Sequence, residues 1–372
     1  VFNNHQNYPL DLPTHYQALR DGGYRVGSVG KLDLHKDTSS PLYWGLDGQY
    51  LMKEWGFTDG LDNEGKMDGR RSWLEANKPK GPYLQYLEER GKSKAYVDEN
   101  KGGLASWVTT VNDEEYCDNW IANNGMEVIR SYPKDQPWYM VFNFTGPHNP
   151  YDVTREMHER WKDVDFPDAH NPNNDKHTAE ERLWLNRYYA AMIENLDTRI
   201  GEIIKVVDER GELDNTLIVF SSDHGEMQGE HGHWGKCSWR EGSVKIPLIV
   251  AGPGVKKGVV SDALCCTEDY TATFLDYAGL AGLPDMEGRS LRPVLEGTEE
   301  SHRDWVYSGL KQPNGNEWHM ALDGVKKYVK QNESEFYFDL ESDPLEDSNL
   351  MASVTENNIS LKKDLEVYLA NN

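Results

Sequence analysis

The sequence has few cysteines, no long apolar run and a deficit of positive charge. Its 4 cysteines are too few for the dense disulfide framework that holds many small secreted domains together. No apolar run is long enough to span a bilayer, so we expect no membrane partner. Lys and Arg number 39 against 63 Asp and Glu, a formal net charge of -24. We therefore expect no nucleic-acid partner, because basic patches supply most of that affinity.

The sequence also lacks an initiating methionine, a signal peptide and any internal repeat. It opens at Val1 in a stretch that is predicted to be a loop, so any targeting segment would lie upstream. The cellular compartment is open on the residues alone.

Length and pattern predict an α/β protein. A chain of 372 residues exceeds what one small core usually organises, and we place a large domain at 1–300 and a small subdomain at 301–372. Alternating strands and helices predict a central, mostly parallel sheet flanked by helices. The predicted helices are 14–21 and 183–209, and the predicted strands are 24–29, 138–145, 216–222 and 246–251. The continuous apolar run 216–222 is typical of a parallel sheet covered on both faces.

The remaining stretches differ in character. Residues 59–103 and 152–179 are polar and predicted to be loop-rich insertions, which either shape a substrate cleft or decorate the surface. Short antiparallel strands are predicted within 319–331 and 335–340, and a final helix within 359–369. The C-terminal subdomain is therefore predicted to be α+β with antiparallel strands.

The densest chemistry follows the strand 216–222. Asp223 and His224 come directly after it, and ligands of open α/β sheets bind at the carboxyl ends of strands. A carboxylate beside an imidazole offers oxygen and nitrogen donors to a divalent cation, although turns often hold such pairs without a metal. Lys236 follows in a loop rich in glycine and histidine, after His231 and His233. Its ammonium could face an oxyanion.

Two other strand ends carry similar residues. Gly30-Lys31 follows the strand 24–29, with Asp33 and His35 close behind, and His148 follows the strand 138–145 in the sequence PHNP. Taken singly, Lys31 is a solvated lysine and His148 a turn residue. Three strand ends that deliver lysine, histidine and aspartate together predict a site for a tetrahedral oxyanion, either sulfate or phosphate.

Five segments, in order along nearly the whole chain, resemble the type I sulfatases of the alkaline phosphatase superfamily. They are GYRVGSVGKLDLHK, FNFTGPHNPYD, YYAAMIENLDTRIGEII, TLIVFSSDHGEMQGEHGHWGKCSWREGSVKIPLIVAGPG and EFYFDLESDPLEDSNL. The pair Asp223-His224 and its spacing to Lys236 are most similar to the choline-sulfatase and phosphonate monoester hydrolase branch. Many sulfatases have asparagine in place of His224.

The resemblance implies a sulfuric ester hydrolase that cleaves a sulfate ester, with a carbohydrate as the expected substrate, through a formylglycine nucleophile. Asp223 and His224 would be ligands of one divalent metal ion, Ca²⁺ by resemblance, with Mn²⁺ made credible by the imidazole. Lys31 and Lys236 would neutralise sulfate oxygens, and His148 would bind the sulfate or protonate the departing alkoxide. The remaining candidates for substrate binding are Asp33, His35, His231 and His233. A periplasmic or secreted location and a formylglycine-generating enzyme as maturation partner are also implied.

The sequence departs from the family pattern in three ways. The signature Cys/Ser-x-Pro-x-Arg is absent, and Cys237-Ser-Trp-Arg240 lacks the proline and sits in the lysine loop, so we reject it as the nucleophile. The paired aspartate ligands that precede that signature are absent too. Gly-Lys-x-His appears as Gly-Lys-Leu-Asp, which leaves open whether Asp33 or His35 takes the histidine position. We therefore expect an N-terminally truncated version of a longer enzyme, inactive by itself.

Two alternatives stay open on the residues. A phosphodiesterase or phosphonate monoester hydrolase would use nearly the same oxyanion cradle. A non-catalytic protein would hold a sulfated small molecule or glycan in the same pocket without cleaving it.

Overall fold

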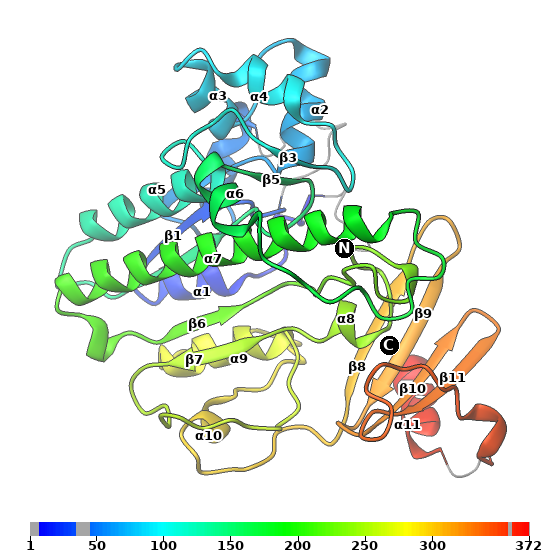
Figure 1. The fold of residues 1–372 in the computed structure, drawn as a ribbon. Coiled ribbons are helices and arrows are strands. Elements are labelled where there is room, and N and C mark those ends of the chain that lie inside the picture. The colour runs from blue at the N-terminus through cyan, green and yellow to red at the C-terminus, as the bar shows by residue number, and fades with distance from the viewer. Residues whose placement is uncertain (1–6, 35–44, 356–358, 372) are drawn as a thin grey trace. The chain divides into compact units, whose positions relative to one another are not determined.

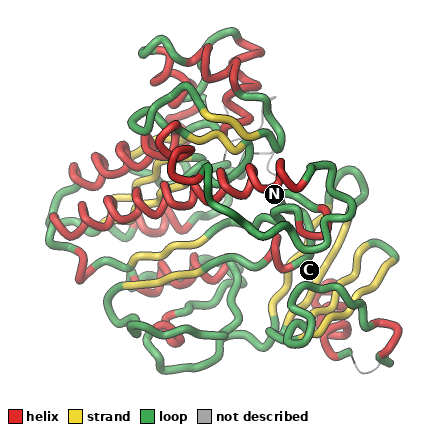
Figure 2. Tube along the Cα trace, viewed as in Figure 1, coloured by secondary structure: helices red, strands yellow, loops and turns green. Residues whose placement is uncertain are grey.

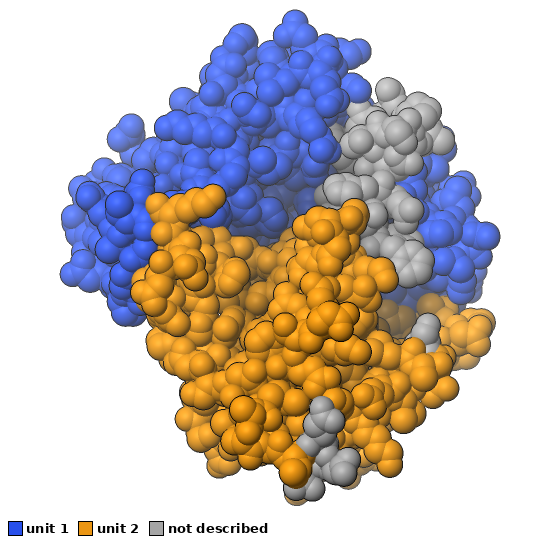
Figure 3. Space-filling model, turned by 90° about the vertical axis from the view of Figure 1, so that its right-hand side faces the viewer, with its two compact units in different colours: residues 1–168, 177–214 blue, residues 169–176, 215–372 orange. Residues whose placement is uncertain are grey.

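The computed structural model describes residues 7–34, 45–355 and 359–371. It divides into two compact units, which are described separately (Figure 3). Unit 1 comprises residues 1–168 and 177–214, and unit 2 comprises residues 169–176 and 215–372. The predicted α/β class is confirmed, while the predicted boundary at residue 300 stays a prediction.

A three-stranded parallel sheet organises unit 1 (Figure 1). Strand β1 (Arg25–Gly30) lies between β2 (Asp59–Asp62) and β4 (Trp138–Asn143), and Gly30 pairs with both Asp62 and Asn143. Gly30 has φ +106°, and a Cβ there would lie 1.9 Å from the Asn143 carbonyl oxygen, so only glycine fits. The predicted strands at 24–29 and 138–145 are confirmed.

Three helices pack on this sheet. Helix α1 (His15–Asp21) contacts β1, and α5 (Cys117–Ser131) contacts β1, β4 and the long α7 (Ala179–Glu209). Met126, Ile129 and Val206 form the apolar cluster between α5, α7 and β4. The predicted helix 183–209 begins earlier, because Thr178 and Glu181 form a reciprocal capping box at its N-terminus.

The prediction that residues 59–103 are loop-rich is wrong. Besides β2, they contain α2 (Lys66–Ala76), α3 (Pro82–Glu88) and α4 (Ser93–Glu99), which Figure 2 shows as helices. These helices are short, and no side chain caps their N-termini, so their sequence carries little helix signal. Tertiary burial of Leu84, Leu87 and Val97 stabilises them instead.

The other elements of unit 1 are small. A 3₁₀ helix, η1 (Leu46–Lys53), precedes β2, and η2 (Leu213–Asn215) follows α7. Strand β3 (Ser106–Val108) pairs in parallel with β5 (Tyr151–Val153). Within the stretch 152–179, also predicted to be loop-rich, α6 (Arg155–Trp161) packs against α7.

Unit 2 begins with a two-stranded ribbon. Strands β6 (Ile218–Ser221) and β7 (Leu248–Ala251) confirm the predicted strands, but they pair antiparallel. Phe220 is 39% exposed and Ile249 63% exposed. The prediction of a parallel sheet buried on both faces is therefore wrong for this ribbon, because its continuous apolar character does not fix the direction of pairing.

A four-stranded antiparallel sheet forms the C-terminal part of unit 2. Its order is β11-β10-β9-β8, and its strands are β8 (Val306–Lys311), β9 (Glu317–Leu322), β10 (Lys326–Gln331) and β11 (Ser334–Asp339). Helix α11 (Ser360–Asn371) lies against one face of this sheet, where it packs on Ala321 and Tyr328 (Figure 1). Trp239 packs on the other face, with Trp318, Met320, Val329 and Phe338. The antiparallel strands and the final helix are confirmed, and β8 was missed.

The short helices of unit 2 are η3 (Glu230–Gly232), α8 (Glu241–Val244), α9 (Glu268–Tyr277), α10 (Arg292–Leu295) and η4 (Met351–Ser353). Among the described residues, no helix combines the length and apolar character that crossing a membrane requires.

Candidate functional site

In unit 2, the segment 223–240, hereafter the lysine loop, follows the carboxyl end of β6. The Nδ1 atom of His224 lies 2.8 Å from the Gly225 carbonyl oxygen and so donates its hydrogen there. The lone pair of the other nitrogen, Nε2, then accepts from Lys236 Nζ at 2.6 Å. Asp223 Oδ2 lies 3.5 Å from the same Nε2, and its side chain is 84% exposed. The structure thus brings together the three predicted residues Asp223, His224 and Lys236.

Gly225 allows the loop to turn back tightly. Its N–H donates to the Ser243 carbonyl oxygen at 2.8 Å. A Cβ at Gly225 would lie 2.3 Å from the Gly242 carbonyl oxygen, a distance that no side chain tolerates. The close approach of these two backbone segments holds His224 in place.

Glu226 organises the inside of the loop and was missed by the sequence analysis. Its carboxylate accepts the N–H of Gly235 at 2.5 Å and that of Gln228 at 3.2 Å. Burial raises the pKa of Glu226, while the two N–H groups oppose that rise. Because Gly235 precedes Lys236, these hydrogen bonds fix the base of the lysine side chain.

The far end of the lysine loop is anchored on the four-stranded sheet. Trp239 is buried and donates from Nε1 to Gln331 Oε1 at 2.9 Å, and Trp318 Nε1 donates to the Cys237 carbonyl oxygen at 3.2 Å. Lys327 Nζ, fully buried, lies 2.7 Å from both Glu241 Oε1 and Glu346 Oε1. The Cys237 backbone therefore helps to anchor the loop on the sheet, and Cys237 itself is exposed.

The two predicted substrate-binding histidines of the loop have different surroundings. His231 Nε2 lies 3.1 Å from a guanidinium nitrogen of Arg240 and 2.8 Å from the Leu345 carbonyl oxygen. His233 is largely exposed, and the partial desolvation of its ring, together with the nearby Arg240 and His231, lowers its pKa. Their role in substrate binding stays a prediction.

In unit 1, Lys31 follows β1 as predicted. Its Nζ lies 3.0 Å from Asp33 Oδ2, and Asp33 adopts φ 58°. The Leu32 N–H donates to Asp62 Oδ1 at 2.8 Å, which holds the turn against β2. His35 lies outside the described residues, so the choice between Asp33 and His35 stays open.

His148 occupies an exposed turn after β4. Its Nδ1 lies 2.6 Å from the Asn149 carbonyl oxygen. Asp118 on α5, missed by the sequence analysis, accepts the N–H of Thr145 at 2.7 Å and that of Gly146 at 3.1 Å. Burial raises the pKa of Asp118, and these hydrogen bonds and Lys66 oppose the rise. A helix residue therefore fixes the strand end that presents His148.

The donor set of the lysine loop fits a divalent cation. When Lys236 Nζ gives up its contact with His224 Nε2, that nitrogen and the carboxylate oxygen 3.5 Å away can both reach one ion at the usual bond lengths of about 2.0–2.5 Å. Hydrogen bonding of His224 Nδ1 to a backbone carbonyl is the support that metal-binding imidazoles usually have.

Comparison with known proteins bears on this site. A family model described as Sulfatase matches residues 3–280, and one described as N-sulphoglucosamine sulphohydrolase, C-terminal, matches residues 229–371. The choline-sulfatase of Rhizobium meliloti (strain 1021) is 28% identical over 389 residues, which cover 94% of this chain and 69% of that protein. The chain spans 60% to 69% of the length of the curated relatives compared with it.

Two solved structures share the fold. The phosphonate monoester hydrolase of Agrobacterium radiobacter gives a TM-score of 0.78 at 21% identity, over 99% of this chain and 82% of that chain. A protein solved with its substrate D-glucosamine-2-N,6-O-disulfate gives a TM-score of 0.77 at 18% identity, over 99% of this chain and 84% of that chain. At these identities the likeness establishes the fold.

Proposed function

The chain belongs to the sulfatase family, and from that premise we propose that the protein is a sulfuric ester hydrolase acting on a sulfated carbohydrate. The observation that carries the proposal is the lysine loop, in which Lys236 Nζ lies 2.6 Å from His224 Nε2 beside the carboxylate of Asp223. Such a loop presents an ammonium group next to a pair of cation ligands, which suits an anionic ester.

The chemistry follows from charge. Transfer of a sulfuryl group builds negative charge on the sulfate oxygens and on the departing oxygen. We assign Lys236 to neutralise the sulfate and to donate a proton from Nζ to the leaving oxygen. Asp223 and His224 would hold the divalent cation, Ca²⁺ or Mn²⁺, which when bound acts as a Lewis acid on a sulfate oxygen.

The remaining roles rest on the family resemblance. Lys31 neutralises a sulfate oxygen, and His148 hydrogen-bonds the sulfate or protonates the departing alkoxide. The attacking hydroxyl would come from a formylglycine, for which this sequence has no Cys/Ser-x-Pro-x-Arg signature. The full-length protein would then need a formylglycine-generating enzyme as maturation partner, and a periplasmic or secreted location suits the family.

Two findings support a carbohydrate as the substrate. Residues 229–371 match a model described as N-sulphoglucosamine sulphohydrolase, C-terminal, and a structural neighbour holds a disulfated glucosamine as its substrate. The runner-up is hydrolysis of a phosphonate monoester, which the same loop would allow and for which a structural neighbour is named.

The test is a substrate panel for the full-length protein, produced together with a formylglycine-generating enzyme. We expect turnover of sulfated glucosamine above that of choline sulfate and a phenyl phosphonate monoester. Lys236→Ala should lower kcat/KM about 100- to 1,000-fold, the usual loss of one group that stabilises transition-state charge. The matched control, Lys257→Ala, changes an exposed lysine outside the loop and should leave kcat/KM unchanged.

Three results would contradict the proposal in different ways. Preference for the phosphonate monoester would establish the runner-up. Full activity of Lys236→Ala would remove the lysine from the mechanism. Saturable binding of sulfated glycan without hydrolysis would make the protein a binding protein.

A further inference from the structure

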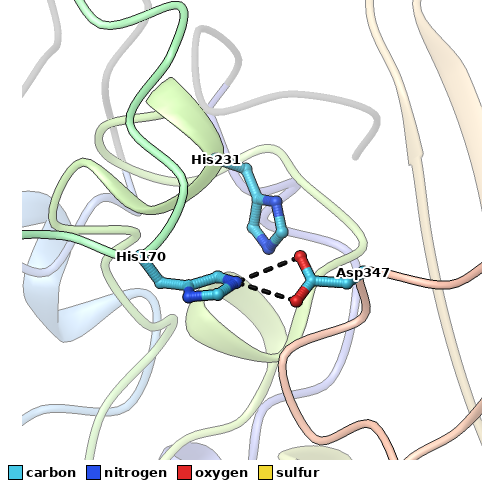
Figure 4. Close-up of side chains that lie close together, drawn as sticks. All are labelled: His170, His231 and Asp347. Carbon is cyan, nitrogen blue, oxygen red and sulfur yellow. Dashed lines mark hydrogen bonds and ion pairs between the residues drawn. The ribbon is translucent and has the colours of Figure 1, made fainter.

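Three side chains of unit 2 converge at a second place, outside the Asp223–His224 pair (Figure 4). They are His170, His231 and Asp347, which come from the segment 169–176, from the lysine loop and from the segment after β11. His170 Nε2 lies 2.9 Å and 3.0 Å from the two carboxylate oxygens of Asp347. One ligand atom from each of the three residues lies within 4.8 Å of the others.

The donor types are those of a transition-metal site. Two neutral imidazoles and one carboxylate are a common protein ligand set for Zn²⁺, which binds nitrogen and oxygen at about 2.0–2.2 Å. In Figure 4 both imidazole rings point toward the Asp347 carboxylate. The Leu345 carbonyl oxygen, 2.8 Å from His231 Nε2, offers a further oxygen beside the three side chains.

The surrounding charges favour a cation. Arg240 is the nearby positive group, and the carboxylates of Asp343, Asp347 and Glu230 all lie close enough to act on it. Its guanidinium contacts both His231 Nε2 at 3.1 Å and the Glu346 carbonyl oxygen at 2.9 Å. His231 Nε2 has a single in-plane position, which either donates a hydrogen to the Leu345 carbonyl oxygen or accepts one from Arg240. A metal ion bound to Nε2 would replace both contacts. The bond from Arg240 to the Glu346 carbonyl oxygen can remain.

We propose that His170, His231 and Asp347 form a zinc site that clamps the segment 169–176 and the segment after β11 onto the lysine loop. The site is separate from the candidate catalytic cation and goes beyond sulfate-ester hydrolysis. A zinc ion at this place would explain why three segments that are far apart in the sequence each contribute one side chain with a metal-binding atom.

The experiment titrates Zn²⁺ into chelator-treated protein of the present chain that carries Asp223→Asn and His224→Ala. These two changes remove the other candidate ligands, so failure of this proposal is distinguishable from failure of the proposed function. We expect one equivalent of Zn²⁺ to bind and to raise Tm. His170→Ala and His231→Ala should each weaken binding by about 100-fold or more, because each removes one direct ligand of the metal.

The matched control is His233→Ala, two residues from His231 and outside the cluster, which should leave Zn²⁺ affinity unchanged. Asp347→Asn is a second, milder variant in case an alanine variant does not fold, and it should weaken binding without loss of circular dichroism. Replacement of Zn²⁺ by Co²⁺ should give visible absorption bands that disappear in His231→Ala. No saturable binding in the starting protein, or binding that the His170, His231 and Asp347 variants all leave unchanged, would overturn the proposal.

Discussion

Lys66 in unit 1 and Lys327 in unit 2 are both almost fully buried, but their partners differ. Lys66 Nζ lies 2.6 Å from a single carboxylate, that of Asp152 on β5, which also accepts from the Tyr96 hydroxyl at 3.4 Å. Lys327 Nζ lies 2.7 Å from two carboxylates, those of Glu241 and Glu346. The pair of Lys66 and Asp152 in unit 1 has no net charge. In unit 2, two carboxylates face the one ammonium group of Lys327, so that cluster is negative.

The difference reflects what each cluster holds. Lys66 joins α2 to β5 inside unit 1, across 86 residues of sequence. Lys327 joins β10 to α8, and Glu346 also accepts the N–H of Glu241 at 2.9 Å. The Lys327 cluster therefore lies directly at the end of the lysine loop. We infer that its buried charges both stabilise unit 2 and hold the loop that carries the candidate functional groups.

Removal of Lys327 should have the largest effect. Lys327→Met leaves Glu241 and Glu346 facing each other without a cation, and loss of one partner from a buried ion pair costs about 3–5 kcal/mol. We expect about 5 kcal/mol of unfolding free energy to be lost in urea denaturation. Lys330→Met on the same strand, where the side chain is exposed, is the control and should change stability by less than about 0.5 kcal/mol. Equal losses for both variants would contradict the buried-charge explanation.

Removal of Lys66 should cost less. Lys66→Met leaves one carboxylate, which keeps the Tyr96 hydroxyl as a donor, so we expect a loss of about 3 kcal/mol. The double variant Lys66→Met/Asp152→Leu removes both charges and should recover most of that loss, because apolar replacements of a buried pair are often neutral. A double variant that is less stable than Lys66→Met would show that Asp152 stabilises the unit through its other contacts.

The third prediction concerns Glu64 in unit 1, a buried carboxyl group whose hydrogen bonds come from backbone N–H groups. Glu64 is buried and accepts the N–H groups of Tyr83 and Leu84, and burial raises its pKa to about 7 from 4.5. Between pH 4.5 and 7 the unfolded chain is ionised while the folded chain keeps its proton. Unfolding therefore becomes easier as pH rises through this window.

Relative to Glu64→Gln, the native protein should lose about 3 kcal/mol of stability between pH 4.5 and 7. Urea denaturation of both proteins across this range measures the difference, with Glu75→Gln on the exposed side of α2 as control. A stability difference that does not change with pH would show that Glu64 is ionised in the folded protein.

Much of the fold could be predicted where a segment carries its own signal. Helix α7 has a long apolar periodicity and a capping box, and β4 is rich in aromatic and β-branched residues. Helix α5 was missed because it contains three Asn and a Gly, and because its N-cap residue, Tyr116, makes no side-chain capping hydrogen bond. The antiparallel pairing of β6 with β7 was also missed, because the sequence of a strand does not determine which strand it pairs with or in which direction.

For the candidate site, sequence analysis identified the residues that could bind a cation or an oxyanion, but it missed the residues that hold them in position. Asp223, His224 and Lys236 stand in a dense motif at a strand end, and the structure brings them together. Asp118 and Glu226 act through hydrogen bonds from backbone N–H groups, and Lys327 acts through a buried ion pair; no local pattern reveals either. The acidic segment containing Glu346 was noticed only as a resemblance, and the structure shows that Glu346 pairs with the buried Lys327, 19 residues before it.

The burial of Trp239 against β9, β10 and β11 has a consequence for recombination. The lysine loop and the four-stranded sheet form one packing unit, because Trp239 of the loop is buried in the apolar cluster of the sheet. A chimera that exchanged residues 223–240 alone between relatives would place an indole on a surface shaped for another side chain. A crossover placed before residue 215, which carries the loop and the sheet together, keeps that surface matched, so the natural segment for exchange is longer than the motif that identifies it.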